Sequence, residues 1–132
     1  METRDIFIRD FRGATLGTIT QQSSAGEIFQ NQTLRPILKL QNDLFVAVFA
    51  NQIAKHKSDF YGLPVEKKMQ YIENVIQKDV KFRNSLKGMV ISLFSLEEYA
   101  VYIRDSSSLN KRMMNMLIER LQSQVQLFEP PG

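Results

Sequence analysis

Hydrophobic positions recur along this chain at the three- and four-residue spacing of amphipathic helices. The pattern predicts a long helix from Thr33 to about Lys57, with Thr33 as its N-cap and Pro36 in its first turn, where a missing N–H costs little. The same spacing predicts another strong helix from Leu109 to Phe128, which the following EPPG sequence ends. The chain therefore reads mainly as helix.

Between these two segments the pattern predicts shorter helices. One starts near Pro64 and ends or kinks near Asp79, after which the apolar spacing resumes. Gly88 lies inside the resumed run, and because glycine costs a helix about 1 kcal/mol relative to alanine, we expect a close helix crossing there. A buried strand over residues 88–94 is the alternative interpretation of this segment.

Two polar clusters mark the helix boundaries that follow. Ser95 and Glu98 have the spacing of a capping box, which predicts a helix that runs to about Arg104. The DSSS sequence at Asp105 to Ser108 then supplies the next break and the next N-cap.

The first 30 residues differ from the rest. Thr3 to Phe11 predicts a short helix that ends at Gly13, with an apolar side made of Ile6, Phe7 and Phe11. The segment from Gly13 to Ser24 is rich in Gly, Thr, Ser and Gln, and we interpret it as a flexible arm or a brief extended segment. The predicted fold is all-α: an irregular bundle of four or five helices (residues 31–128) with a flexible N-terminal arm (residues 1–30).

Composition excludes several chemistries. The chain contains no cysteine, which excludes disulfides, thiolate metal sites, iron–sulfur clusters and cysteine nucleophiles. Its one histidine, His56, falls near the end of a predicted helix, and no metal-binding or phosphate-loop motif is present. The three serines of DSSS lack a nucleophile elbow. We therefore expect no metal and no cofactor, and we favour a protein that is not an enzyme.

The charge is mildly positive in the middle of the chain. The net charge is +3; residues 32–58 carry four basic and one acidic side chain, and residues 59–87 carry six basic and four acidic ones. The longest apolar run, Leu44 to Ala50, is too short to span a bilayer, so we expect a cytoplasmic protein that does not enter a membrane.

A row of polar side chains on the long predicted helix is the first candidate binding site. Arg35, Lys39 and Asn42 are spaced four and three residues apart and so share a helical face. Arg83 and Lys87 form a similar basic pair on a later helix. If the two helices pack antiparallel, these five side chains converge into an anion-binding cleft. The alternative is that each row is simply a solvated helix face.

A second candidate is a subunit interface on the last helix. Met114 and Ile118 widen its apolar stripe beyond what one neighbouring helix needs. These two side chains are candidates for a contact with another subunit; the alternative for the methionine-rich stripe is that it fills the core.

Three segments carry a resemblance to known sequences. They are FQNQTLRPILKLQNDLF, IQKDVKFRNSLKGMV and SSSLNKRMMNMLIERLQSQVQLF. The chain resembles, from about Glu27 to Phe128, a small uncharacterised bacterial family of helical proteins, some of which are labelled glyoxalase. The resemblance implies a compact cytoplasmic helical protein and brings no catalytic residues. Glyoxalase activity is not expected, because the metal sites of those enzymes need more histidines than one.

Three functional hypotheses remain open at this point. The first is a non-enzymatic scaffold or protein-interaction module that forms a homodimer. The second is a protein, or an enzyme, that binds a small anion in a basic cleft. The third, an RNA-binding accessory protein, is the weakest, because no aromatic residues are interleaved with the basic ones.

Overall fold

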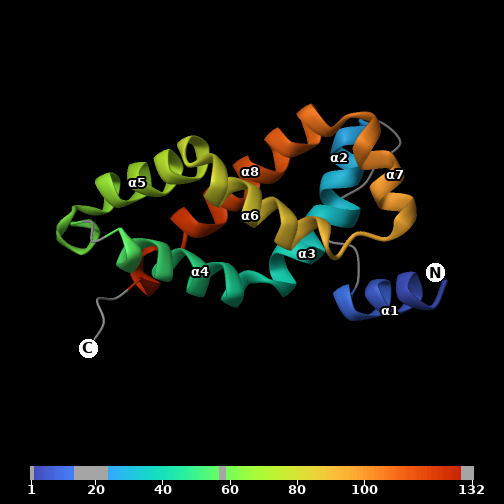
Figure 1. Cartoon of the computed structure of the whole chain (residues 1–132), viewed down its shortest axis with the longest axis horizontal. Helices are drawn as coiled ribbons and strands as arrows, with labels where there is room; N and C mark the ends of the chain where they lie inside the picture. The colour runs from blue at the N-terminus through green and yellow to red at the C-terminus, as the bar shows by residue number, and fades with distance from the viewer. Residues whose placement is uncertain (1, 14–23, 57–58, 129–132) are drawn as a thin grey trace.

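The computed structural model describes residues 2–13, 24–56 and 59–128, and these form an all-α protein without strands, as predicted (Figure 1). The described residues form α1 to α8, more than the four or five helices expected, because breaks at single residues divide the longer predicted helices. The α-helices are α1 (Glu2–Arg12), α2 (Ala25–Phe29), α3 (Arg35–Leu40), α4 (Asn42–Lys55), α5 (Val65–Lys78), α6 (Val80–Ile91), α7 (Leu96–Arg104) and α8 (Ser106–Gln122). A π-helical turn (Gln30–Leu34) joins α2 to α3, and 3₁₀ turns lie at Phe60–Gly62 and Val125–Leu127.

The helix expected to begin at Thr33 begins earlier, so that expectation is wrong. Ser24 is the N-cap, and its side chain accepts a hydrogen bond from the N–H of Glu27. Thr33 falls instead within the π-helical turn and is buried. Pro36, at the start of α3, has no N–H to donate to the carbonyl of Gln32 four residues earlier, so a regular α-helix cannot continue through this point.

The predicted break at Asp79 is confirmed. Its side chain accepts from the N–H of Phe82 at 3.0 Å and caps α6. Because α6 continues to Ile91, the strand alternative for residues 88–94 is wrong. The close crossing expected at Gly88 is wrong as well, since a Cβ atom placed there would meet nothing within 4 Å.

The core forms around α8. This helix packs against α5, α6, α7 and the π-helical turn, and Leu117 and Leu121 on it are fully buried. A group of aromatic rings, Phe49, Phe60, Phe82 and Phe128, closes the end of the core near the C-terminus of α4.

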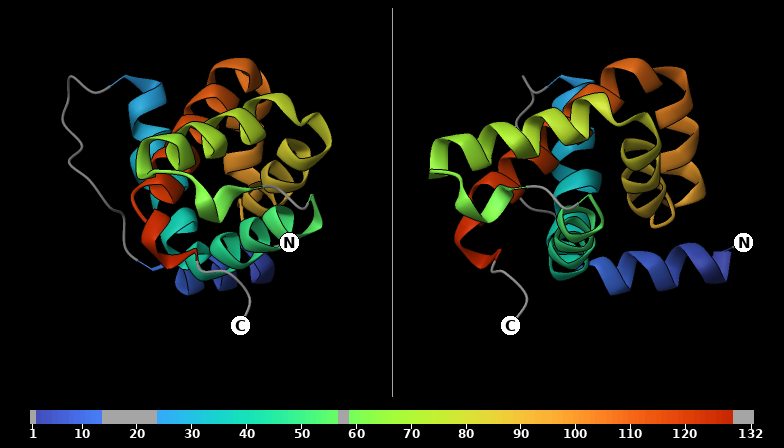
Figure 2. Two further views of the ribbon diagram at one scale, coloured as in Figure 1. Left: turned by 90° about the vertical axis from the view of Figure 1, so that its left-hand side faces the viewer. Right: turned by 60° about the vertical axis from the view of Figure 1, so that its left-hand side comes forward.

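Helix α1 lies along the outside of the bundle, next to α3 (Figure 2). The predicted helix from Thr3 to Phe11 is thus present, and it ends at Gly13, whose φ of 83° is favourable only for glycine. The flexible arm predicted from Gly13 to Ser24 falls mostly on residues 14–23, outside the described part of the chain. None of the described helices is both long enough and apolar enough to cross a bilayer.

Candidate functional site

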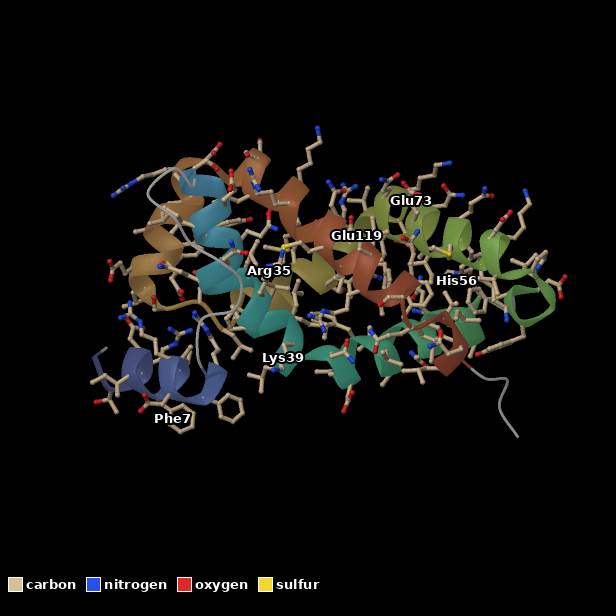
Figure 3. The ribbon with its side chains drawn as sticks, turned by 180° about the vertical axis from the view of Figure 1, so that it is seen from behind. Phe7, Arg35, Lys39, His56, Glu73 and Glu119 are labelled. Carbon is tan, nitrogen blue, oxygen red and sulfur yellow. The ribbon has the colours of Figure 1, made fainter. Side chains whose placement is uncertain are left out.

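Three of the five predicted binding residues line cavities, and these are two different cavities. Arg35 lines a cavity of about 470 Å³ together with α8 residues such as Glu119 and Arg120. Arg83 and Lys87 line a different cavity of about 390 Å³. Lys39 is exposed and, as Figure 3 shows, lies further along α3 toward α1. The cleft expected from their convergence does not form, because each basic row faces a different part of α8.

Asn42 lines neither of these cavities, but it is bonded to two residues that line the first one. Its Nδ2 donates to Gln124 Oε1 at 2.8 Å, and Gln124 Nε2 donates back to Asn42 Oδ1 at 2.8 Å. Arg120 Nη1 lies 3.5 Å from the same Asn42 oxygen. Arg35 Nε donates to Asn31 Oδ1 at 2.7 Å. Of the predicted row, Arg35 therefore lines this cavity, and Asn42 contacts two other residues that line it, Arg120 and Gln124.

Arg120 was not predicted from the sequence. It is half-buried, and burial together with the positive charge of Arg35 lowers the pKa of its guanidinium. Its position, on a face of α8 that also holds core residues, gave no signal of a binding role. Only the packing of α8 beside the start of α3 brings the two arginines together.

The second feature that the sequence did not reveal is how α1 is attached. Arg4 donates to the carbonyl of Phe94 at 2.9 Å and to that of Ser92 at 3.1 Å, and Arg12 donates to that of Leu93 at 3.2 Å. These carbonyls follow the end of α6, where a helix leaves acceptors without intrahelical partners. Charged side chains of α1 therefore supply hydrogen-bond donors for the backbone carbonyls of the loop between α6 and α7.

Helix α1 also forms hydrogen bonds with the start of α7 and with the π-helical turn. Asp5 accepts from the N–H of Leu96, the first residue of α7, at 3.2 Å. Arg12 Nη2 lies 3.2 Å from the carbonyl of Gln32, the group that Pro36 leaves without its α-helical donor. The exposed pair Arg9–Glu97 adds a contact of 3.1 Å.

A buried ion pair lies at the centre of this attachment. Arg12 donates through both Nη atoms to Glu98, and Thr33 Oγ1 donates to Glu98 Oε2 at 2.6 Å. Burial by itself would raise the pKa of Glu98. The hydrogen bonds from Arg12, Thr33 and the N–H of Ser95, together with the Arg12 charge, outweigh burial and lower this pKa from 4.5 to about 2. Glu98 is thus ionised in the folded protein at neutral pH.

The charged side of α1 faces the bundle and its apolar side faces outward. Ile8 is the buried apolar residue of this helix. Phe7, Phe11 and Ile6 are 67%, 57% and 61% exposed, and the rings of Phe7 and Phe11 stack with centroids 5.9 Å apart. Figure 3 shows Phe7 on the side of α1 that points away from the bundle. We refer to Ile6, Phe7 and Phe11 as the outer face of α1.

The two residues predicted to form a subunit interface on α8 are buried. Met114 and Ile118 are only 7% and 6% exposed and pack in the core of the single chain. The expectation that they contact another subunit is corrected by this burial. The wide stripe that suggested it exists because α8 is surrounded by α5, α6, α7 and the π-helical turn.

His56 lies at the C-terminal cap of α4, as the sequence indicated. Its Nε2 is 2.9 Å from Gln52 Nε2, which also donates to Asp79 Oδ2 at 3.2 Å. Residues 2–13, 24–56 and 59–128 contain no cluster of three or more His, Cys, Asp or Glu side chains that could bind a metal ion.

Comparisons with known proteins complete this description. No family model, no curated protein and no solved structure matches the chain.

Proposed function

We propose that this protein is a helical interaction module that forms a homodimer through the outer face of α1. The observation that supports the proposal is the exposed, stacked pair Phe7–Phe11 on a helix whose charged side chains are used to hold it against the bundle. Exposed aromatic residues held on a fixed helix are typical of protein interfaces. A free chain gains nothing in solution by presenting them.

The extent of this surface supports a partner protein. With about 150–250 Å² for each large side chain, the outer face of α1 exposes roughly 350 Å², which is in the range of functional patches. Leu96 of α7, whose N–H is bonded to Asp5 of α1, is a further exposed apolar residue near this helix, with 40% of its surface accessible. Two copies that pair through these residues and a polar rim reach the size of a small specific interface, about 1,000 Å² in total.

Charge favours a second copy of this chain over a membrane as the partner. Helix α1 carries three arginines and three acidic residues, so two copies approach without net repulsion. A helix that binds anionic lipids keeps basic side chains along its polar face for the headgroups. Here Arg4, Arg9 and Arg12 are bonded to the bundle itself.

The test is sedimentation equilibrium on the wild type and on the double variant Phe7→Ser/Phe11→Ser. We expect the wild type to dimerise with a Kd of about 1–10 μM and the variant to remain monomeric at about 100 μM, because the apolar centre of the interface is lost. Neither substitution removes a buried side chain, so both proteins should show the same circular dichroism spectrum.

A matched control uses Val65→Ser/Leu127→Ser. Both residues are 57% exposed; Val65 is the first residue of α5 and Leu127 the last of the 3₁₀ turn Val125–Leu127. In Figure 1 the start of α5 lies at the end of the bundle opposite to α1, and α5 contacts this 3₁₀ turn. This control should dimerise like the wild type. A wild type that stays monomeric at about 100 μM, or a control that dissociates as the Phe7/Phe11 variant does, contradicts the proposal.

A further inference from the structure

Two arginines face one cavity without an acidic partner. Arg35 and Arg120 both line the cavity of about 470 Å³ between the start of α3 and the C-terminal half of α8. In the described part of the chain, neither guanidinium has a carboxylate within 4.0 Å. Two unneutralised cations close enough to influence each other cost free energy, and a bound anion removes that cost.

Hydrogen bonds restrain part of each arginine at this cavity before any ligand arrives. The bond from Arg35 Nε to Asn31 leaves the two Nη groups of Arg35 without a partner among the described residues. The paired amides of Asn42 and Gln124 stand beside Arg120, and Gln124 also donates to the Arg120 carbonyl at 2.9 Å. Fixed guanidinium groups lose little entropy when they bind an oxyanion through two parallel hydrogen bonds.

We propose that Arg35 and Arg120 together form a binding site for a phosphate monoester of a small hydroxylated molecule. Two guanidinium groups match the charge of a phosphate dianion and supply paired donors for its oxygens. A cavity of about 470 Å³ holds more than a phosphate group alone. Glu119 and Ser123 also line it and offer acceptors to the hydroxyl groups of the ligand.

Two other cavities are less suited to this ligand. Beside α1, Arg12 already binds the carboxylate of Glu98. Between α6 and α8, Arg83 donates to the carbonyl of Gln77 at 2.6 Å, and the other cations there, Lys87 and Lys111, are lysines, which act as hydrated point charges.

The test is an NMR titration of the ¹⁵N-labelled protein with glycerol 3-phosphate at constant ionic strength, with glycerol and sodium chloride as reference titrations. We expect saturable shifts on amides of residues 30–42 and 116–124, with a Kd of about 1 mM or below. Binding should strengthen between about pH 5 and pH 7, as the phosphate loses its second proton near pH 6.

Three variants locate the site. Arg35→Gln and Arg120→Gln should each weaken binding by about tenfold or more, because each removes one charged fork. Lys39→Gln removes the same charge from the same helix without touching the cavity and should change the Kd by less than about twofold. The spectrum of each variant reports its folding in the same experiment.

The opposite results would overturn the proposal. These are an absence of saturation by about 20 mM, shifts centred on residues 83–87 and 107–115, or an equal loss of affinity in Lys39→Gln. The Phe7→Ser/Phe11→Ser variant should bind glycerol 3-phosphate like the wild type, so a failure of this site and a failure of dimerisation are distinguishable.

Discussion

Glu98 performs two tasks in this protein. Its carboxylate accepts a hydrogen bond from the N–H of Ser95 at 2.7 Å, as the second half of a capping box. It also accepts hydrogen bonds from Arg12 of α1 and from Thr33 of the π-helical turn. One side chain thus connects the start of α7, the N-terminal helix and the segment before α3. The low pKa of Glu98 is the measurable consequence.

That pKa predicts a specific loss of stability in acid. Because the folded pKa is about 2 and the unfolded value 4.5, the contribution of Glu98 to the free energy of unfolding is complete above about pH 4.5 and is lost as the pH falls toward 2. The full contribution is about 3 kcal/mol, of which about 2 kcal/mol is lost by pH 3. Urea unfolding at several pH values between 3 and 7 measures it.

Glu98→Gln is the comparison for this experiment. The variant should be less stable than the wild type at pH 7, and the difference between the two proteins should shrink as the pH falls. Identical pH profiles for wild type and variant would show that Glu98 does not have the depressed pKa.

At the scale of helices, the caps of α7 and α8 offer a contrast. The sequence suggested an N-cap for both. Ser95 accepts from the N–H of Glu98 at 3.1 Å and is fully buried, whereas the side chain of Asp105 makes no capping hydrogen bond to α8. Of these two helices, α7 is therefore the one that is stabilised by the side chain of its N-cap residue.

The contrast leads to a paired prediction. Ser95→Ala should lower the free energy of unfolding by about 1–2 kcal/mol, because it leaves the N–H of Glu98 without its acceptor. Asp105→Ala should lower it by less than about 0.5 kcal/mol, since no capping bond is lost. Chemical denaturation of the two variants measures these free energies of unfolding. An equal decrease in both variants would contradict the assignment of the caps.

Helix α1 turns its charged side toward the bundle and its apolar side toward the solvent, the reverse of the usual arrangement. Its buried side contains one apolar residue, Ile8, among charged residues that recur at the same three- and four-residue spacing. The sequence showed Ile6, Phe7 and Phe11 on one apolar side of this helix, and the usual preference for burying apolar surface would turn that side inward. The carbonyls after α6 and the N–H of Leu96 oppose that preference, because the charged side chains of α1 supply their hydrogen-bond partners.

For the whole molecule, dimerisation predicts that thermal stability depends on protein concentration. A folded dimer is favoured by mass action, so the Tm of the wild type should rise by about 2–3 °C for each tenfold increase in concentration above the Kd. The Tm of Phe7→Ser/Phe11→Ser should stay constant over the same range. Differential scanning calorimetry measures both, and a constant Tm for the wild type would argue against the dimer.

The sequence by itself determined the helical class, the break at Asp79 and the capping box at Ser95, because these depend on the spacing of apolar residues and on contacts within one turn of helix. Only the tertiary structure decided which polar side chains meet. Arg35 lies at the same cavity as Arg120, and Asn42 is bonded to Arg120 and Gln124, although about 80 residues separate these partners along the chain. Met114 is buried because other helices surround α8, whereas Phe7 remains exposed to solvent. Apolar spacing is a local signal, whereas pairing between distant helices depends on how they pack and on which backbone groups that packing leaves unsatisfied.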